Sequence, residues 1–488
     1  MDYMNLSIEE LHQLLKEKKV KPSDLAKQAL DKAKALQHPY NGFVTILEEA
    51  LEVAKELDNQ EVEGPLFGIP YAAKDNYSTK GILSTGSSNI LKDYVPVYDA
   101  TVIAKLKEEK AVLIGKTVLD ELAMGGTGLN GHTGKCINPW DKELSRMSGG
   151  SSGGSAVAVA AGIVPYALGS DTGDSVRKPA AYCGIVGFKP TWGRISRYGV
   201  FPFCPSLDHV AYFTRNVKDC SYLLDALAGF DKHDSTSAKI EIPNYSQNIN
   251  TDISNYKIAC IKEIENSLYD DVVKENFKQI KIKLKELGAV VEDVHMDETL
   301  LRAIYPVYMV LSCSEATSNN ANLDGIKFGP RAEGKDIDEV VINSRTQGFS
   351  ELVKRRFVIG SYCLAKQNKD KLFVRAQKVR RLIVEALNKI YESYDLILCP
   401  AAGDIAPKFA GRNTEKLSNE YLIAENHLAL GNFAGLPSIT IPSGFHKEMP
   451  IGINLMGKAF HELDVFNVAS ALEQVLGLKN QVAKVGGN

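Results

Sequence analysis

The sequence predicts an α/β fold built on a mixed β-sheet, and three observations support that prediction. The chain has 488 residues, of which 44% are hydrophobic and 24% charged, a composition typical of a globular protein with a large core. Short apolar runs with strand character alternate with amphipathic helical segments. Neither an internal repeat nor a long low-complexity tract interrupts this alternation.

The N-terminal part begins with helices and continues with alternating elements. Ser7 and Glu10 have the spacing of a capping box, which predicts a helix start, and a second helix is expected to open at Ser23 and Asp24 after Pro22. Apolar runs predict strands at residues 43–47 and 111–114. Helices are expected at residues 48–57 and 101–110.

A polar segment at residues 231–256 precedes a second run of alternating elements and is expected to be a linker or an exposed insertion. Apolar residues between 273 and 287 then recur at spacings of four and three, which predicts one face of a long helix that ends at Gly288. Further strands are expected at residues 256–261, 290–291, 396–398, 438–441 and 451–455, and further helices at residues 349–365, 370–390 and 461–475.

Charge, cysteine and histidine content exclude several classes of function. The formal net charge is −3, so no overall basic excess directs the chain to nucleic acid. The 9 histidines lack HxxxH or HExxH spacing, so no metal site is expected, and the 8 scattered cysteines are expected to be buried free thiols. Because neither a signal peptide nor a membrane span is recognisable, we expect a cytoplasmic protein.

The most unusual segment is the Gly/Ser-rich stretch at residues 147–155, which precedes a run of small apolar residues. It has the composition of a flexible linker, but it also suits a tight turn at the N-terminus of a closely packed helix. The same stretch matches GxSxG with Ser152 as nucleophile, although residues 144–148 make a poor preceding strand. Gly115-Lys116-Thr117 echoes a phosphate-binding loop, but Lys110 stands where that motif requires glycine.

A serine nucleophile in this chain would need a lysine as its base. Ser175 follows Ser151 by 24 residues, and neither local motif contains a histidine. Lys74 ends the apolar stretch 68–73, whereas an arbitrary lysine is usually solvated. A lysine at the end of a buried strand can lose its charge through desolvation, so that its neutral amine becomes a usable base.

These segments together resemble the amidase signature family. The landmarks are residues 68–75 (GIPYAAKD), 149–155 (GGSSGGS), 169–177 (GSDTGDSVR), 187–191 (GFKPT) and 206–208 (SLD). The resemblance extends from about residue 5 to residue 475 and implies one amidase domain, residues 1–488, with a central mixed sheet covered by helices on both faces. N-terminal helices within residues 1–60 would pack on a signature core at 61–215, and residues 257–488 would complete the substrate pocket.

Within that family the chain is similar to the A subunits of glutamyl-tRNA(Gln)/aspartyl-tRNA(Asn) amidotransferases. The segments that carry this similarity are residues 121–126, 138–141, 193–199, 353–356, 377–380, 432–437 and 450–452. The resemblance implies Ser175 as nucleophile, Lys74 as base and Ser151 as a bridging serine that follows a cis peptide bond from Gly150. It also implies that backbone N–H groups of Thr172, Gly173 and Asp174 hold the oxyanion.

The resemblance further implies a substrate pocket with two departures from the family pattern. Arg356 would bind the α-carboxylate of glutamine, and Tyr308 and Gly125 would line the pocket. Asn426 stands where the family has an aspartate for the α-amino group, and the neighbouring Glu425 could replace that aspartate. Asp174 stands where the family usually has glycine. These two differences keep open a free-standing amidase that acts on another primary amide.

The implied activity is glutamine hydrolysis that supplies ammonia to a partner. A B subunit would carry ATP, Mg²⁺ and most of the charged tRNA, and a small C subunit would complete a heterotrimer. The product would be Gln-tRNA(Gln) or Asn-tRNA(Asn), and no cofactor is expected in this chain. A non-catalytic scaffold role is a third possibility, which the intact positions 74, 151 and 175 argue against.

Overall fold

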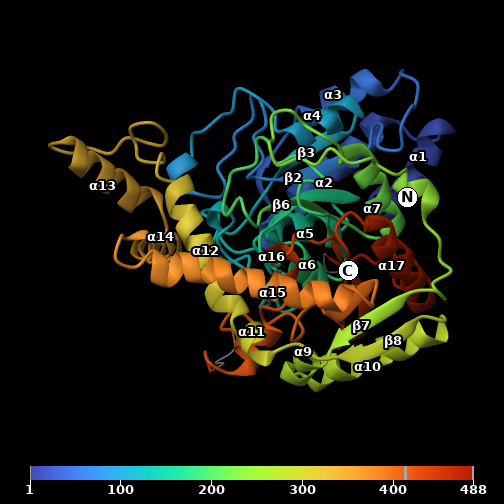
Figure 1. Ribbon diagram of the computed structural model, residues 1–488. Helices are drawn as coiled ribbons and strands as arrows, with labels where there is room; N and C mark the ends of the chain where they lie inside the picture. The colour runs from blue at the N-terminus through green and yellow to red at the C-terminus, as the bar shows by residue number, and fades with distance from the viewer. Residues whose placement is uncertain (1, 412–414, 486–488) are drawn as a thin grey trace.

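An eleven-stranded sheet runs through the computed structural model, which describes residues 2–411 and 415–485 (Figure 1). Its strand order is β1-β3-β2-β4-β6-β5-β10-β11-β9-β7-β8. The strands are β1 (Phe43–Ile46), β2 (Pro70–Lys74), β3 (Val112–Thr117), β4 (Tyr166–Asp171), β5 (Val186–Lys189), β6 (His209–Thr214), β7 (Lys257–Ile261), β8 (Val290–Val294), β9 (Leu396–Pro400), β10 (Ser438–His446) and β11 (Met449–Gly457).

The sheet is mixed, as the sequence predicts. Strand β2 lies parallel to both β3 and β4, and β7 lies parallel to both β8 and β9. The pairs from β4 through β6, β5, β10 and β11 to β9 are antiparallel. Two parallel units therefore flank an antiparallel centre, and the carboxyl ends of β2 and β4 open side by side.

Helices cover both faces of this sheet, and most of the crossovers between strands are helical. They are α1 (Ile8–Lys16), α2 (Pro22–Tyr40), α3 (Ala50–Leu57), α4 (Thr101–Glu108), α5 (Gly153–Ala160), α6 (Arg177–Cys183), α7 (Val217–Leu227), α8 (Tyr245–Asn248), α9 (Lys262–Ser267), α10 (Asp271–Glu286), α11 (Glu298–Arg302), α12 (Ile304–Asn319), α13 (Ile337–Gly348), α14 (Glu351–Leu364), α15 (Arg375–Tyr391), α16 (Ala429–Phe433) and α17 (Glu462–Leu476). Short 3₁₀ turns are η1 (Tyr3–Asn5), η2 (Asn89–Leu91) and η3 (Glu121–Ala123), and π-helical turns are η4 (Asp370–Val374) and η5 (Glu420–Ala424).

Successive residues of a strand belong in turn to two separate hydrophobic clusters, one on each face of the sheet. In β9, Leu396 and Leu398 belong to the cluster that contains α10 and α17, whereas Ile397 belongs to the cluster that contains α12 and α15. Successive side chains of a strand point to opposite faces, so both faces of this part of the sheet are buried. Its strands are therefore continuously apolar and lack the two-residue alternation of a half-exposed strand.

The helices predicted from periodicity form close to the expected bounds. Ser7 caps α1 through a complete capping box with Glu10. Helix α10 buries the predicted face of Val273, Phe277 and Leu284, and Gly288, which follows that helix, has a φ of +94°. Side chains on these faces stabilise the fold by leaving water for the core, at about 25 cal/mol per Å² of apolar surface.

Several predicted bounds differ from the structure for identifiable reasons. Strand β3 continues to Thr117, because its last residues pair with β2 as far as Lys74. Strands β10 and β11 are longer than predicted because they form one antiparallel hairpin, with residues 438–446 paired to residues 449–456. The helix expected at 370–390 begins as the π-helical turn η4 and becomes α15 at Arg375.

The polar segment 231–256 lies over the sheet with part of its length buried. Tyr245 is fully buried in α8 and belongs to the main core, and Asp234 is also buried. Most of the remaining residues are exposed, in keeping with the predicted linker or exposed insertion, and Tyr245 attaches the segment to the core.

The cysteines and the helix lengths bear on the compartment predictions. All eight cysteines are buried and unpaired, which confirms the prediction of buried free thiols. Among the helices of the described residues, none is both long and apolar enough to cross a membrane.

Candidate active site

Lys74 ends strand β2 in the middle of the parallel unit, with no solvent exposure. Its Nζ lies 2.8 Å from Ser151 Oγ, 2.8 Å from Ser152 Oγ and 2.9 Å from Ser170 Oγ. The first two serines lie in the turn before α5, and the third lies in β4. The amine is therefore enclosed by hydroxyl groups from two segments that are remote from it in sequence.

Burial gives Lys74 the electrostatics of a base. Desolvation lowers the pKa of Lys74 from 10.5 to about 7, against the opposing charges of Asp120, Asp171 and Asp208. A group with a pKa near 7 is partly unprotonated at neutral pH and can accept a proton. The prediction that a lysine at the end of a buried strand is desolvated is thus supported by the geometry.

The Gly/Ser-rich stretch forms a tight turn at the start of α5. The Gly150–Ser151 peptide bond is cis, as the resemblance implies. Gly150 has no space for a side chain, because a Cβ there would lie 2.1 Å from Asp120 Oδ2. The linker interpretation is wrong, since residues 148–155 are all buried and lead into helix α5.

Asp120 organises the loop that faces this turn. Its carboxylate accepts hydrogen bonds from the backbone N–H groups of Thr127, Gly128 and Asn130, each at 3.0 Å. Its own N–H donates to the carbonyl of Ser151 at 3.0 Å. Asp120 therefore connects the Gly125–Asn130 loop to the Ser151 turn, a role that its local sequence pattern does not indicate.

Ser175 lies in the loop between β4 and α6, beside the same turn. The Ser152 N–H donates to the Ser175 carbonyl at 3.2 Å, and the Ser175 side chain is buried. Among the hydrogen bonds of the described residues, none joins the hydroxyls of Ser151 and Ser175. The structure thus places Lys74 in contact with Ser151 and holds Ser175 next to them through the backbone. The Ser151–Ser175 contact stays a prediction.

The Ser175 loop presents backbone donors to the cavity. In the described part of the chain, the N–H groups of residues 172–175 donate no hydrogen bond within the protein. Asp171 fixes this loop at its N-terminal end. Its carboxylate accepts a hydrogen bond from the Val176 N–H at 3.0 Å and another from Arg177 Nη2 at 2.9 Å. Although burial alone would raise the pKa of Asp171, the Arg177 guanidinium holds it below its ordinary range. A buried ion pair thus fixes a loop whose donors are left available.

The predicted substrate residues converge on one cavity of about 220 Å³. Its lining includes Gly125, Gly173, Asp174, Tyr308, Arg356 and Asn426, which come from separate segments of the chain. The Arg356 Nη1 atom is buried without a hydrogen-bond partner among the described residues. A guanidinium with an unused donor suits a carboxylate ligand.

The two departures from the family pattern lie in this cavity. Asp174 forms an ion pair with Lys178, one helical turn further along, and Lys178 also donates to the Glu425 carbonyl at 2.8 Å. The backbone of Asp174 lies outside the left-handed region, so a side chain fits there. Asn426 donates through Nδ2 to the Tyr421 carbonyl at 2.6 Å, which leaves its Oδ1 as the acceptor for a ligand.

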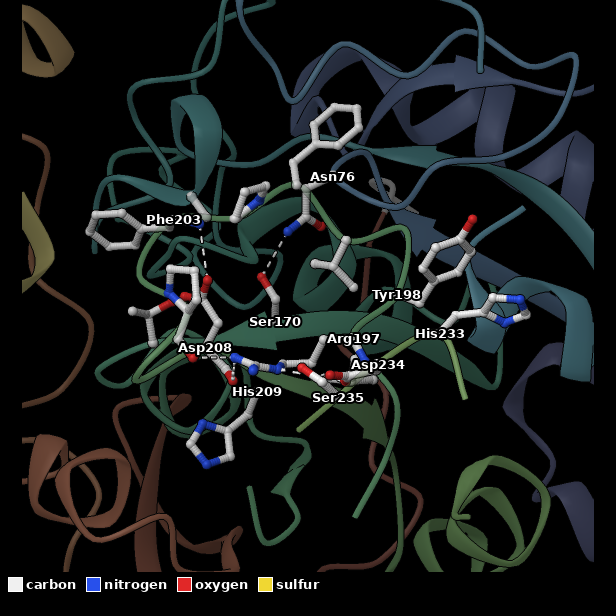
Figure 2. A pocket seen from close by; sticks show the side chains of 17 residues that line it. Asn76, Ser170, Arg197, Tyr198, Phe203, Asp208, His209, His233, Asp234 and Ser235 are labelled. Atoms are coloured by element: carbon white, nitrogen blue, oxygen red, sulfur yellow. Dashed lines mark hydrogen bonds and ion pairs between the residues drawn. The ribbon is translucent and has the colours of Figure 1, made fainter. Parts of the chain in front are cut away.

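A second cavity, of about 250 Å³, has Ser170 in its wall (Figure 2). The Asn76 amide points at Ser170 and donates to its hydroxyl at 3.0 Å. Thr172 and Asp208 also line this cavity, and their side chains are joined by a hydrogen bond of 2.7 Å. Asn76, Ser170 and Lys178 belong to the site, although no local pattern in the sequence singles out their side chains.

The structure agrees with the sequence argument against a phosphate-binding loop at residues 115–117. All three residues lie in β3, and the buried Lys116 Nζ lies 3.2 Å from Asp75 Oδ1 and donates to the Tyr77 carbonyl at 2.8 Å. This lysine is therefore engaged inside the fold.

Comparisons with known proteins show the family of this chain. Residues 24–466 match the family model described as Amidase. The chain is 40% identical over 483 residues to the A subunit of glutamyl-tRNA(Gln) amidotransferase from Heliobacterium modesticaldum, with 98% of both chains covered. It is 43% identical over 480 residues to the corresponding protein of Carboxydothermus hydrogenoformans, with 97% of this chain and 98% of the other covered. The crystal structure of the Thermotoga maritima counterpart is similar with a TM-score of 0.80 at 35% identity, over 97% of this chain and 95% of the other.

Proposed function

The chain belongs to the amidase family, and on that premise we propose that it is the glutamine-hydrolysing A subunit of a tRNA-dependent amidotransferase. The observation that carries the proposal is the desolvated Lys74 amine in contact with Ser151, beside Ser175 and a cavity that contains Arg356. The full-length similarity to glutamyl-tRNA(Gln) amidotransferase A subunits supports the choice of glutamine as substrate.

Glutamine binding uses the charged groups of the cavity. Arg356 pairs with the α-carboxylate through its unused Nη1 donor. Asn426 Oδ1 and the carboxylate of Glu425 receive the α-ammonium group, since both residues line the cavity. The side-chain amide then extends between Tyr308 and the Ser175 loop, toward the turn that contains Ser151.

Acylation proceeds by a proton relay. Lys74 Nζ takes a proton from Ser151 Oγ while Ser151 takes one from Ser175 Oγ, and Ser175 Oγ bonds to the amide carbon. Backbone N–H groups of residues 172–174 hold the oxyanion, each worth about 3–4 kcal/mol. The proton returns from Lys74 through Ser151 to the leaving nitrogen, the C–N bond breaks, and ammonia departs.

Deacylation repeats the same steps with water. Water attacks the glutamyl ester of Ser175, its proton passes to Lys74, and the Ser175 oxygen leaves with that proton to give glutamate. The ammonia goes to a B subunit, which uses ATP and Mg²⁺ to amidate Glu-tRNA(Gln) or Asp-tRNA(Asn). A small C subunit completes the heterotrimer, and the activity is cytoplasmic.

The test of this proposal is ammonia release from glutamine by the full chain, with and without B and C subunits and charged tRNA. Ser175→Ala is expected to lower kcat by at least about 10³-fold, because the nucleophile is lost. Ser155→Ala serves as the control, since Ser155 is also a buried serine, in α5, and its hydroxyl forms hydrogen bonds with Thr117 and Leu168. An unchanged rate in Ser175→Ala would contradict the nucleophile assignment.

A free-standing amidase is a second candidate, favoured by Asp174 and Asn426 at positions where the family pattern differs. It predicts that the isolated chain hydrolyses simple primary amides as fast as glutamine. The same assay with asparagine and simple amides distinguishes the two functions, because the amidotransferase reaction requires the α-carboxylate that Arg356 binds.

A further inference from the structure

We propose that Ser152 is a positioning residue that turns the lone pair of the neutral Lys74 amine toward Ser151. This inference rests on the proposed function, because it requires Lys74 to act as the base. Ser151 and Ser152 lie at the same distance, 2.8 Å, from Lys74 Nζ. Distance alone therefore does not decide which serine gives its proton to the amine.

The hydrogen bonds of Ser152 decide the question. Its hydroxyl donates to the Ser170 carbonyl at 3.1 Å, and it accepts from Lys74 at 2.8 Å and from the Ser170 N–H at 3.3 Å. A serine hydroxyl has one proton and two lone pairs, and all three are used here. Ser152 therefore receives an N–H of Lys74 and has no proton to give it.

Ser170 takes the second N–H of the amine. Its Oγ accepts from Lys74 at 2.9 Å and from Asn76 Nδ2 at 3.0 Å (Figure 2), which occupies both of its lone pairs. A neutral amine has two N–H groups and one lone pair. The Ser170 carbonyl is a further acceptor at 3.3 Å, so Ser170 presents two oxygens to the amine. The two N–H groups are thus assigned to Ser152 and Ser170, and the lone pair to Ser151.

Ser151 is assigned as the donor because its Oγ has the fewest other partners: Ser170 Oγ also accepts from Asn76, and the Ser152 proton goes to the Ser170 carbonyl. Within the described residues, Ser151 Oγ has a hydrogen bond only to Lys74, so its proton is not committed to a backbone carbonyl. Each of the three N–H groups of the protonated amine also finds an acceptor, because three serine hydroxyls and the Ser170 carbonyl surround Nζ. The arrangement accommodates Lys74 both before and after it takes the proton.

The experiment compares pH–rate profiles of glutamine hydrolysis by the full chain with its B and C subunits, for wild type, Ser152→Ala and Ser155→Ala. Ser155 is the matched control, since it is a buried serine of the same helix whose hydroxyl also donates to a β4 carbonyl, that of Leu168. The charged groups acting on Lys74 are Asp120, Asp171 and Asp208, and none of these variants changes them.

Ser152→Ala is expected to lower kcat on the alkaline plateau about 10- to 100-fold with KM unchanged, because the lone pair of the Lys74 amine is no longer oriented toward Ser151. The acid limb should move to lower pH by about one unit, since an oxygen that accepts from the ammonium favours the charged form. Ser155→Ala should leave both features as in wild type. A Ser152→Ala profile that matches wild type, or an equal change in Ser155→Ala, would overturn the proposal.

Two further variants make every outcome informative. If Ser152→Ala does not fold, Ser170→Ala removes the acceptor of the other N–H and is expected to change the plateau and the limb in the same directions. An unchanged Ser170→Ala profile would then refute the inference. Failure of the proposed function looks different, because wild type would release no ammonia or Lys74→Ala would keep the wild-type rate.

Discussion

At the scale of single residues, the unusual Asp174 is explained by its partner. A carboxylate beside the donors of the oxyanion loop would repel a developing negative charge. Lys178 lies one turn further along and pairs with it inside the cavity wall. Burial alone would lower the pKa of Lys178, but Asp174 and Glu425 hold it above its ordinary value, so the ammonium stays charged. We therefore interpret Asp174 and Lys178 as one neutral unit.

This interpretation predicts a non-additive pair of substitutions. Lys178→Met is expected to lower kcat for glutamine about tenfold or more, because Asp174 is left unpaired next to the oxyanion donors. Asp174→Gly combined with Lys178→Met should recover most of that loss. Lys142→Met, which breaks the exposed pair with Glu448, is the control for removing a lysine. Steady-state kinetics of the single and double variants measure the coupling, and additive effects would refute it.

At the scale of elements, the position of Arg356 depends on how α14 begins. The helix follows Ser350, whose side chain makes no capping hydrogen bond. The carboxylate of the buried Glu121 instead holds this N-cap residue by its backbone, since it accepts from the Ser350 N–H at 3.1 Å and from Ser88 Oγ at 2.5 Å. Glu121 lies in η3, directly before the Gly125–Asn130 loop that Asp120 holds. One acidic residue thus connects the loop at one side of the cavity with the helix at the other.

Glu121→Ala is accordingly expected to affect binding more than chemistry. The Ser350 N–H loses its acceptor, the first turn of α14 loosens, and Arg356 meets the α-carboxylate less well. Because a misplaced Arg356 weakens ground-state and transition-state binding alike, KM for glutamine should rise by roughly tenfold or more, with kcat changed less. Glu351→Ala is the control, because Glu351 lies in the same turn but is exposed and pairs with Lys354. A fall in kcat without a rise in KM would contradict this role.

At the scale of the whole molecule, two buried carboxyls connect the ends of the chain. Asp219 in α7 accepts from the Ile8 N–H of α1 at 3.0 Å, and Glu473 in α17 accepts from the Val217 N–H at 3.0 Å. Burial raises the pKa of Asp219 to about 6 and that of Glu473 to about 8. Helices α1 and α17 are therefore each connected to α7 by a buried acid whose pKa is raised.

The pH dependence of stability follows from these shifts. The pKa of Glu473 is higher in the folded state than in the unfolded state. Its contribution to the stability of the fold is therefore fully present at pH below the unfolded pKa and is lost as pH rises toward 8. Between these two pKa values, each proton that only the folded state holds makes the free energy of unfolding fall by about 1.4 kcal/mol per pH unit. Glu473→Gln should therefore show a smaller fall in Tm between pH 6 and pH 8 than wild type. Glu52→Gln, an exposed site paired with Lys55, should keep the wild-type slope, and equal slopes for Glu473→Gln and wild type would refute the prediction.

The sequence by itself determined those features that depend on neighbouring residues. The alternation of short apolar runs with amphipathic segments predicted the α/β class, the 3.6-residue periodicity predicted helices such as α10, and the apolar stretch before Lys74 predicted a buried strand end. The resemblance added the cis bond at Gly150–Ser151 and the residues that line the substrate cavity. Strands β4 to β6 were not predicted from periodicity, because strands buried on both faces do not alternate.

Only the tertiary structure decided which groups meet around the amine. The three serines at Lys74 come from the turn before α5 and from β4, and the equal distances of Ser151 and Ser152 are visible only once β2 and β4 pair. Asp174 and Lys178 are neighbours on one helical turn in sequence, yet their position in a cavity opposite Arg356 depends on α14. The physical reason is that local patterns set the direction of each element. Hydrogen bonds and charge pairs between distant segments depend on how those elements pack.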